Sequence, residues 1–193
     1  MIAESLAVFM LAIAFDILLG EPPARVHPVV WIGKLIAFLR ARARPTRLSG
    51  IVLAIVVIST TVLLGHLAVK AAGLVPLLPL LVSAYLFKST IAIRCLLQVS
   101  HDIGRMIERD MEEAKTMLPA LVGRDTSQLS KSQASSAVIE SLSENYVDSI
   151  LSPIFYYLIF APFGLGLEAA LAFKAISTMD SMVGYKTKGL KEL

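Results

Sequence analysis

The chain has 193 residues, 56% of them hydrophobic, with a mean hydropathy of +0.73 and a formal net charge of +3. This hydropathy excludes an ordinary soluble domain, and several apolar stretches approach the roughly 20 residues that cross a bilayer. The positive charge is small and clustered in one segment, which excludes nucleic acid as an expected partner and leaves membrane lipid as the expected surroundings. The sequence therefore predicts an all-α, polytopic membrane protein that forms one domain over residues 1–193.

The first apolar stretch, residues 2–19, lacks a basic flank and is predicted to be a retained membrane span rather than a signal peptide. It contains Asp16. A carboxylate inside a span normally faces protein or water, so Asp16 either belongs to a functional site or lies close enough to the interface to reach water.

A proline-rich loop follows. Three prolines between residues 20 and 33 restrict the backbone, so Glu21, Arg25 and His27 are held in a fixed arrangement. Such a loop can bind a substrate or can simply separate two helices. His27 is a candidate base, ligand or hydrogen-bonded loop residue.

Residues 34–47 carry five basic residues, which the positive-inside rule places in the cytoplasm, with the N-terminus outside. Two further spans are predicted near residues 49–69 and 77–97. Lys88 lies deep in the second of these, and Asp16 is a candidate partner for its ammonium group.

Residues 98–118 have apolar side chains at helical spacing and charges of alternating sign. This pattern predicts an amphipathic helix that opens a cytoplasmic helical region over residues 98–150. In the joint that follows, Asp125 and Gln128 resemble a capping box, and the guanidinium of Arg124 suits a phosphate or a carboxylate.

Three acidic residues, Glu140, Glu144 and Asp148, are spaced to lie on one face of the next helix. We name them the acidic column. The sequence has no basic residue between Lys131 and Lys174, so positive charge must come from outside this segment. Carboxylate oxygens suit Mg²⁺ that bridges to phosphate, with Asn145 as a neutral neighbour. The alternative is a solvated acidic face beside a membrane.

The apolar stretch at residues 154–176 is broken by Pro162, Gly164 and Gly166. It is either one span or a re-entrant hairpin of two short helices, and we expect the hairpin, whose broken backbone must be covered by protein. The hairpin would bring Lys174 and Asp180 to the cytoplasmic side with the acidic column.

Six motifs occur in a fixed order: Asp16-x3-Gly20-Glu21-Pro22-Pro23, His27-Pro28-Val29, Val122-Gly123-Arg124-Asp125-Thr126, Glu140-Ser141-x2-Glu144-Asn145-x2-Asp148, Pro153-x-Phe155-Tyr156, and Lys174-x5-Asp180-Ser181-Met182-Val183-Gly184-Tyr185. Together they cover residues 16–186. In this order, within a membrane protein, they resemble the adenosylcobinamide-phosphate synthase family of cobalamin biosynthesis.

This resemblance implies a ligase that requires ATP as co-substrate and Mg²⁺, and that joins a carboxylate of adenosylcobyric acid to the amine of aminopropanol phosphate. The corrinoid and the amino-alcohol phosphate are then its substrates. It also implies positions for the site, with roles that follow from residue chemistry. The expected metal ligands are Glu140, Glu144 and Asp148; the expected catalytic residues are Asp180 and Glu144; the expected substrate or phosphate ligands are Glu21, Arg25, His27, Arg124, Asn145, Lys174 and Lys186.

Two other functions stay open. A Mg²⁺-dependent membrane transferase acting on a diphosphate would also need spaced acidic residues, although Asp180 stands alone where a second acidic motif is usual. A non-catalytic scaffold or truncated relative is the third interpretation. Family members continue beyond Lys186, so we expect either a homo-oligomer or a partner that supplies the C-terminal region.

Overall fold

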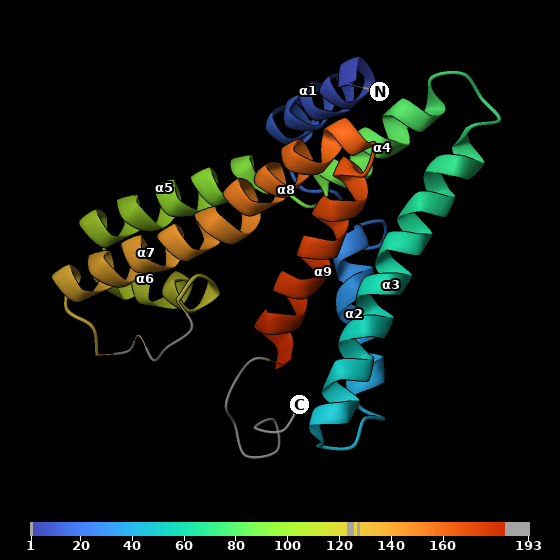
Figure 1. Cartoon of the computed structure of the whole chain (residues 1–193). Coiled ribbons are helices and arrows are strands. Elements are labelled where there is room, and N and C mark those ends of the chain that lie inside the picture. Colours follow the sequence, from blue (N-terminus) through green and yellow to red (C-terminus); the bar gives the residue numbers. More distant parts are fainter. Residues whose placement is uncertain (1, 123–125, 127, 184–193) are drawn as a thin grey trace.

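The computed structural model describes residues 2–122, 126 and 128–183, and within these ranges the chain forms only helices and the turns between them (Figure 1). This confirms the predicted all-α class. The α-helices are α1 Ile2–Leu19, α2 Pro28–Arg40, α3 Arg47–Ala72, α4 Leu78–Lys88, α5 Ile93–Arg109, α6 Met111–Met117, α7 Lys131–Tyr146, α8 Ser152–Phe160 and α9 Gly166–Val183. Short 3₁₀ turns cover Leu118–Ala120 and Ala161–Phe163, and a π-helix covers Val147–Leu151.

Four helical stretches are long and apolar enough to cross a membrane, namely Ile2–Leu19, Arg47–Ala72, Leu78–Arg109 and Lys131–Phe163. They support the predicted polytopic membrane protein. The first two match the predicted spans closely. The third is interrupted at residues 89–92, between α4 and α5, where the sequence indicated one continuous span. The fourth joins the acidic helix α7 to α8, so the predicted boundary between a polar region and the apolar stretch is not a break in the helix.

Helix α9 lies at the centre of the bundle and packs against α2, α3, α4 and α8 (Figure 1). Gly65 of α3 faces Leu171 of α9, and a Cβ added at that glycine would lie 2.4 Å from the leucine side chain. Small residues let helices approach closely, which is how van der Waals packing stabilises helix pairs in a bilayer. On the other side of the bundle, the rings of Phe87 and Tyr157 stack with centroids 4.1 Å apart and join α4 to α8.

Helices α8 and α9 form the hairpin that the glycine and proline residues predict. Gly164 adopts a left-handed backbone conformation with φ +73°, which suits a residue without a side chain. A Cβ added at Gly166 would lie 2.8 Å from the backbone oxygen of Tyr157, so the turn closes tightly. The depth of this hairpin in a membrane stays a prediction.

Helices α5, α6 and α7 form a second packed unit, which extends away from the bundle (Figure 1). The apolar spacing over residues 98–118 predicts its core, because Ile103, Ile107, Ala114 and Leu118 are all buried there. The helix breaks at Asp110, whose carboxylate caps α6. The capping box before α7 is formed by Ser130 and Gln133, not by the predicted pair, of which Asp125 lies outside the described residues.

Candidate functional site

The proline loop, residues 20–27, is fixed from several directions. The Tyr85 hydroxyl donates to the Val26 carbonyl at 2.7 Å, and the Trp31 indole donates to the Arg25 carbonyl at 3.0 Å. His27 is the N-cap of α2, since its Nδ1 accepts the Val29 amide at 3.2 Å. Capping therefore explains part of the role of His27, and the loop is as stiff as its prolines predict.

Glu21 links this loop to the bundle. Its Oε2 lies 2.8 Å from His27 Nε2, and its Oε1 lies 3.1 Å from the Nζ of Lys88. His27 Nδ1 accepts a hydrogen bond from a backbone amide. A neutral imidazole therefore carries its hydrogen on Nε2, and this N–H donates a hydrogen bond to Glu21. Burial by itself raises the pKa of Glu21, but hydrogen bonds from His27 and Lys88 and their charges outweigh burial and lower that pKa below its ordinary value of 4.5.

Lys88 ends α4 and is almost completely buried, with 3% of its side chain exposed. Its Nζ also lies 3.1 Å from Oδ1 of Asp16, which confirms the expected partner. The other oxygen of Asp16 accepts the backbone amide of Arg94 at 2.9 Å, in the first turn of α5. Asp16, Glu21, His27 and Lys88 thus form one connected group, which we name the charged centre.

The break between α4 and α5 fits around this centre. The guanidinium of Arg94 donates to the carbonyls of Ile17 and Leu18 at 3.1 and 2.8 Å, so it caps the C-terminal end of α1. The Ala92 amide donates to the Ser149 carbonyl at 3.0 Å. That bond ties the break to the π-helix, which begins directly after α7 and carries Asp148.

Glu140 and Glu144 of the acidic column lie one turn apart in α7, whereas Asp148 lies in the π-helix that follows, and all three side chains are exposed. That the three share one face stays a prediction. At the end of the column, Oδ2 of Asp148 lies 3.5 Å from the hydroxyl of Ser177 in α9. Lys174, one turn earlier in α9, is partly buried. Lys174 and Ser177 are one turn apart in α9, so they share a side of that helix and Lys174 is the candidate for the expected outside charge.

In the described part of the chain, the other predicted site residues form no side-chain hydrogen bond or ion pair with the charged centre. Arg25 is exposed on the proline loop, and the amide of Asn145 donates to the Ser141 carbonyl at 2.8 Å within its own helix. Asp180 is exposed and lies six residues beyond Lys174, which turns it about 120° away around the helix axis. Arg124 and Lys186 lie outside the described residues. Among the residues described, no three His, Cys, Asp or Glu side chains are close enough to hold a metal ion without other ligands.

Sequence reasoning raised Asp16 as a possible site residue and as the candidate partner of Lys88, but it gave neither residue a role in the site, and it did not include Arg94 or Ser177. The first three had a usable signal, because charged residues inside apolar stretches are costly and normally pair or line a cavity. Ser177 had none, since a serine in a helix is common and its contact with Asp148 joins residues far apart in the chain.

The lowered pKa of Glu21 predicts a pH dependence. Its ionised form contributes stability above about pH 4.5, and that contribution is lost as the pH falls through the lowered value. We expect the unfolding free energy to fall between about pH 6 and about pH 3, and to fall less in a Glu21→Gln variant. The measurement is the free energy of unfolding of detergent-solubilised protein, determined at each pH. Glu113→Gln, an exposed residue of α6, is the matched control, and an equal slope in all three proteins would contradict the assignment.

The protein is a polytopic helical membrane protein, since it has four helical stretches long and apolar enough to cross a bilayer. It contains a charged internal site, where the stiff proline loop is joined through Glu21 to the buried Lys88 at the break between α4 and α5. The chain belongs to the CobD/Cbib protein family, whose model matches residues 9–193.

Curated relatives agree with this membership. The chain is 49% identical over 197 residues to "Probable cobalamin biosynthesis protein CobD" of Methanothrix thermoacetophila, covering 97% of this chain and 62% of the relative. It is 39% identical over 186 residues to the protein of the same name in Methanothermobacter thermautotrophicus, covering 94% and 59%. It is 39% identical over 192 residues to "Cobalamin biosynthesis protein CobD" of Klebsiella pneumoniae, covering 94% and 58%. The chain therefore spans about three fifths of the length of these relatives. No solved structure matches it.

Proposed function

We propose that this chain acts in cobalamin biosynthesis and carries the site of an ATP-dependent ligase on the cytoplasmic side of the membrane. The ligase would join a carboxylate of adenosylcobyric acid to the amine of aminopropanol phosphate. The names of the relatives support the pathway for those proteins, and extending it to a chain of three fifths their length is part of the proposal.

One observation carries the proposal. The hydroxyl of Ser177, one turn after Lys174 in α9, lies 3.5 Å from Asp148 at the end of the acidic column. The adjacent Ser149 carbonyl accepts a hydrogen bond from the Ala92 amide beside the charged centre. Motifs from distant parts of the chain therefore approach one another, and there an anionic substrate would meet both the ammonium of Lys174 and the carboxylates proposed to bind a metal. This supports a phosphate-handling site better than it supports a solvated acidic face.

The proposed reaction needs an activated carboxylate. ATP transfers a phosphoryl group to the carboxylate oxygen, which becomes a leaving group; the amine then attacks the carbonyl carbon, a C–N bond forms, and the C–O bond to phosphate breaks. Asp180 would accept the proton that the amine loses. Lys174 would hold a phosphate oxygen, and Arg124 and Lys186 are proposed to do the same. Glu21, Arg25 and His27 would border the corrinoid entrance.

The acidic column fits Mg²⁺ by its chemistry. In nucleotide-dependent sites Mg²⁺ is usually held by one or two carboxylates, with substrate phosphates and water as its other ligands. One or two of the carboxylates of Glu140, Glu144 and Asp148, all exposed, would supply the protein ligands. The ion would neutralise negative charge on the phosphates of ATP. Exposed carboxylates that need other ligands are consistent with a site completed by the nucleotide.

Purified chain, incubated with adenosylcobyric acid, aminopropanol phosphate and Mg-ATP, tests the proposal. We expect nucleotide cleavage that depends on both other substrates, together with formation of the amide, detected by mass spectrometry. Cleavage without amide would contradict the ligase, and release of diphosphate from a prenyl substrate would favour the transferase. If the chain alone is inactive, adding the C-terminal region of a relative should restore amide formation; continued inactivity would support a scaffold.

A further inference from the structure

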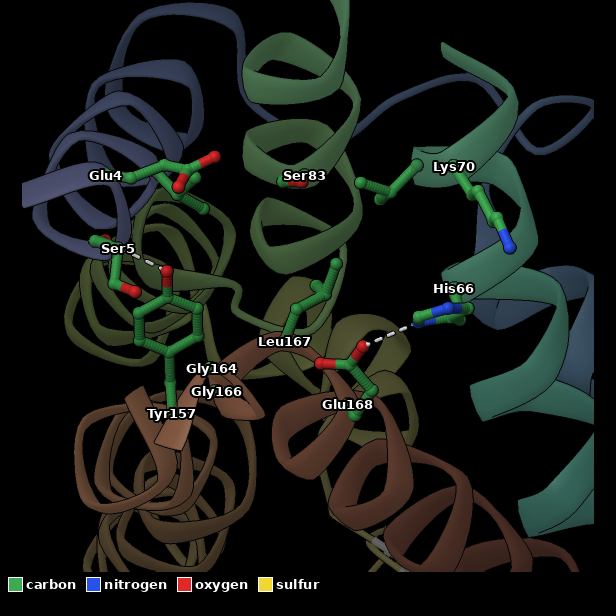
Figure 2. A pocket seen from close by; sticks show the side chains of 12 residues that line it. Glu4, Ser5, His66, Lys70, Ser83, Tyr157, Gly164, Gly166, Leu167 and Glu168 are labelled. Atoms are coloured by element: carbon green, nitrogen blue, oxygen red, sulfur yellow. Dashed lines mark hydrogen bonds and ion pairs between the residues drawn. The ribbon is translucent and has the colours of Figure 1, made fainter. Parts of the chain in front are cut away.

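A pocket with charged side chains in its lining lies near the start of α1 and the α8–α9 turn (Figure 2). These elements are at the end of the bundle opposite the basic segment 34–47 (Figure 1). The volume of the pocket is about 480 Å³. Its lining includes Glu4, Ser5, His66, Lys70, Ser83 and Glu168. We name it the end pocket. None of these residues belongs to the charged centre or to the acidic column, so the end pocket is a separate feature of the molecule.

The end pocket carries both signs of charge. Figure 2 shows Glu4 extending from α1 on one wall, Lys70 and His66 extending from α3 on the opposite wall, and Ser83 of α4 between them. His66 Nδ1 lies 3.1 Å from Glu168 Oε1, which fixes one carboxylate oxygen and leaves the other to accept from a ligand. Carboxylates bind primary ammonium groups and lysine binds phosphate, so these walls complement a ligand that carries both.

The floor of the end pocket is rigid. Tyr157 is buried beneath it, and its hydroxyl donates to the Ser5 carbonyl at 2.9 Å. Gly166 lets the α8–α9 turn close against the Tyr157 backbone, as a Cβ there would lie 2.8 Å from that carbonyl oxygen. A pocket whose floor is held in place needs less ordering when a ligand binds.

An apolar groove of about 510 Å³ adjoins the end pocket and shares Glu168 with it. It runs between α3, α8 and α9. Its other lining residues include Val62, Tyr156, Phe160, Phe173 and Ile176. The rings of Tyr156 and Phe173 stack with centroids 5.2 Å apart, which gives the groove a flat apolar wall. A pocket lined by charged side chains, beside an apolar groove, fits a molecule with a zwitterionic head and a hydrocarbon tail.

We propose that the end pocket binds the head group of a phospholipid that carries a primary amine. The ammonium group donates to Glu4 and Glu168, the phosphate accepts from Lys70, and an acyl chain lies in the apolar groove. The requirement for a primary amine excludes two common kinds of phospholipid. The quaternary ammonium of phosphatidylcholine has no N–H to donate, and the glycerol head group of phosphatidylglycerol has no positive charge. This inference does not depend on the proposed ligase activity, because the end pocket shares no residue with the proposed ligase site.

Native mass spectrometry of the purified chain, exchanged into detergent with equimolar phosphatidylethanolamine, phosphatidylcholine and phosphatidylglycerol, tests this inference. We expect phosphatidylethanolamine to be retained about tenfold more than the other two, and Lys70→Gln or Glu168→Gln to reduce that retention about tenfold, as loss of one charge-assisted hydrogen bond does. Lys70→Arg, which keeps the charge, should retain the lipid. Lys34→Gln, an exposed residue of α2, is the matched control and should behave as the unaltered chain.

Several outcomes would overturn the inference. Equal retention of all three lipids would show that the protein does not select this head group. Unchanged retention of phosphatidylethanolamine in both Lys70→Gln and Glu168→Gln would show that the head group does not bind in this pocket. Binding of free O-phosphoethanolamine as tightly as the lipid would assign the pocket to a soluble amino-alcohol phosphate instead. Circular dichroism of each variant separates loss of the fold from loss of binding, and Lys70→Arg gives a folded comparison if Lys70→Gln does not fold.

Discussion

Replacing Lys88 with Met should destabilise the protein by about 3–5 kcal/mol, because it removes the cation between two carboxylates. Asp16 is completely buried, and its Oδ1 and the Oε1 of Glu21 each lie 3.1 Å from the Lys88 ammonium. Without that ammonium, Asp16 must remain charged and unpaired or bind a proton. Unfolding by SDS measures the loss, with the fluorescence of Trp31 as a local probe, since this is the single tryptophan of the chain and it contacts the proline loop.

A double substitution distinguishes lost pairing from lost packing. Asp16→Asn combined with Lys88→Met removes both charges of the buried pair, and it should be more stable than Lys88→Met alone. The control is Lys34→Met, at an exposed position of α2, where we expect a change within about 0.5 kcal/mol. If Lys88→Met and Lys34→Met unfold alike, the ion pairs do not contribute to stability.

Replacing Glu144 with Gln should lower amide formation by about 100-fold while leaving stability almost unchanged. Changing a metal ligand or its support commonly costs 10- to 100-fold or more in activity, and surface substitutions usually change stability by less than about 0.5 kcal/mol. Glu144 is exposed in α7, so its removal should not disturb the packing of that helix. The measurement is the rate of amide formation by purified protein, with membrane levels compared in parallel.

Glu108→Gln provides the matched control, because Glu108 is also an exposed glutamate on a helix of the same unit, α5. It should retain full activity. Retained activity in Glu144→Gln would exclude this carboxylate from the metal site. Lost activity together with a lost fold would show instead that Glu144 stabilises the helix, and raising the Mg²⁺ concentration would then restore nothing.

The sequence predicts those parts of the fold that depend on local patterns. Hydropathy locates α1 and α3, and the breaks at Gly164 and Gly166 predict the α8–α9 hairpin. The break at residues 89–92 contains no Gly or Pro and was missed. There the hydroxyls of Ser89 and Thr90 donate to carbonyls three residues earlier, a competition with the helix that sequence alone does not resolve.

The site depends on contacts between distant segments and was therefore predicted only in part. The cost of a charge inside a span makes Asp16 a candidate partner for Lys88, and the contact in the structure confirms that candidate. The sequence does not show which segment approaches the end of the acidic column, because the contact of Ser177 with Asp148 depends on how α9 packs in the bundle. Nor does the sequence show that Glu21 binds Lys88 and His27 together, since that depends on where the proline loop lies.

The buried pairing of Asp16 with Lys88 has a consequence for how the chain enters a bilayer during synthesis. An unpaired aspartate or lysine at the centre of a span costs about 2.5–3.5 kcal/mol at the translocon. Asp16 lies three residues from the end of α1 and Lys88 is the last residue of α4, so each charge adds a smaller cost when its helix inserts alone. About 70 residues separate the two side chains, so we expect this cost to be relieved only after α4 has been synthesised and the ion pair can form.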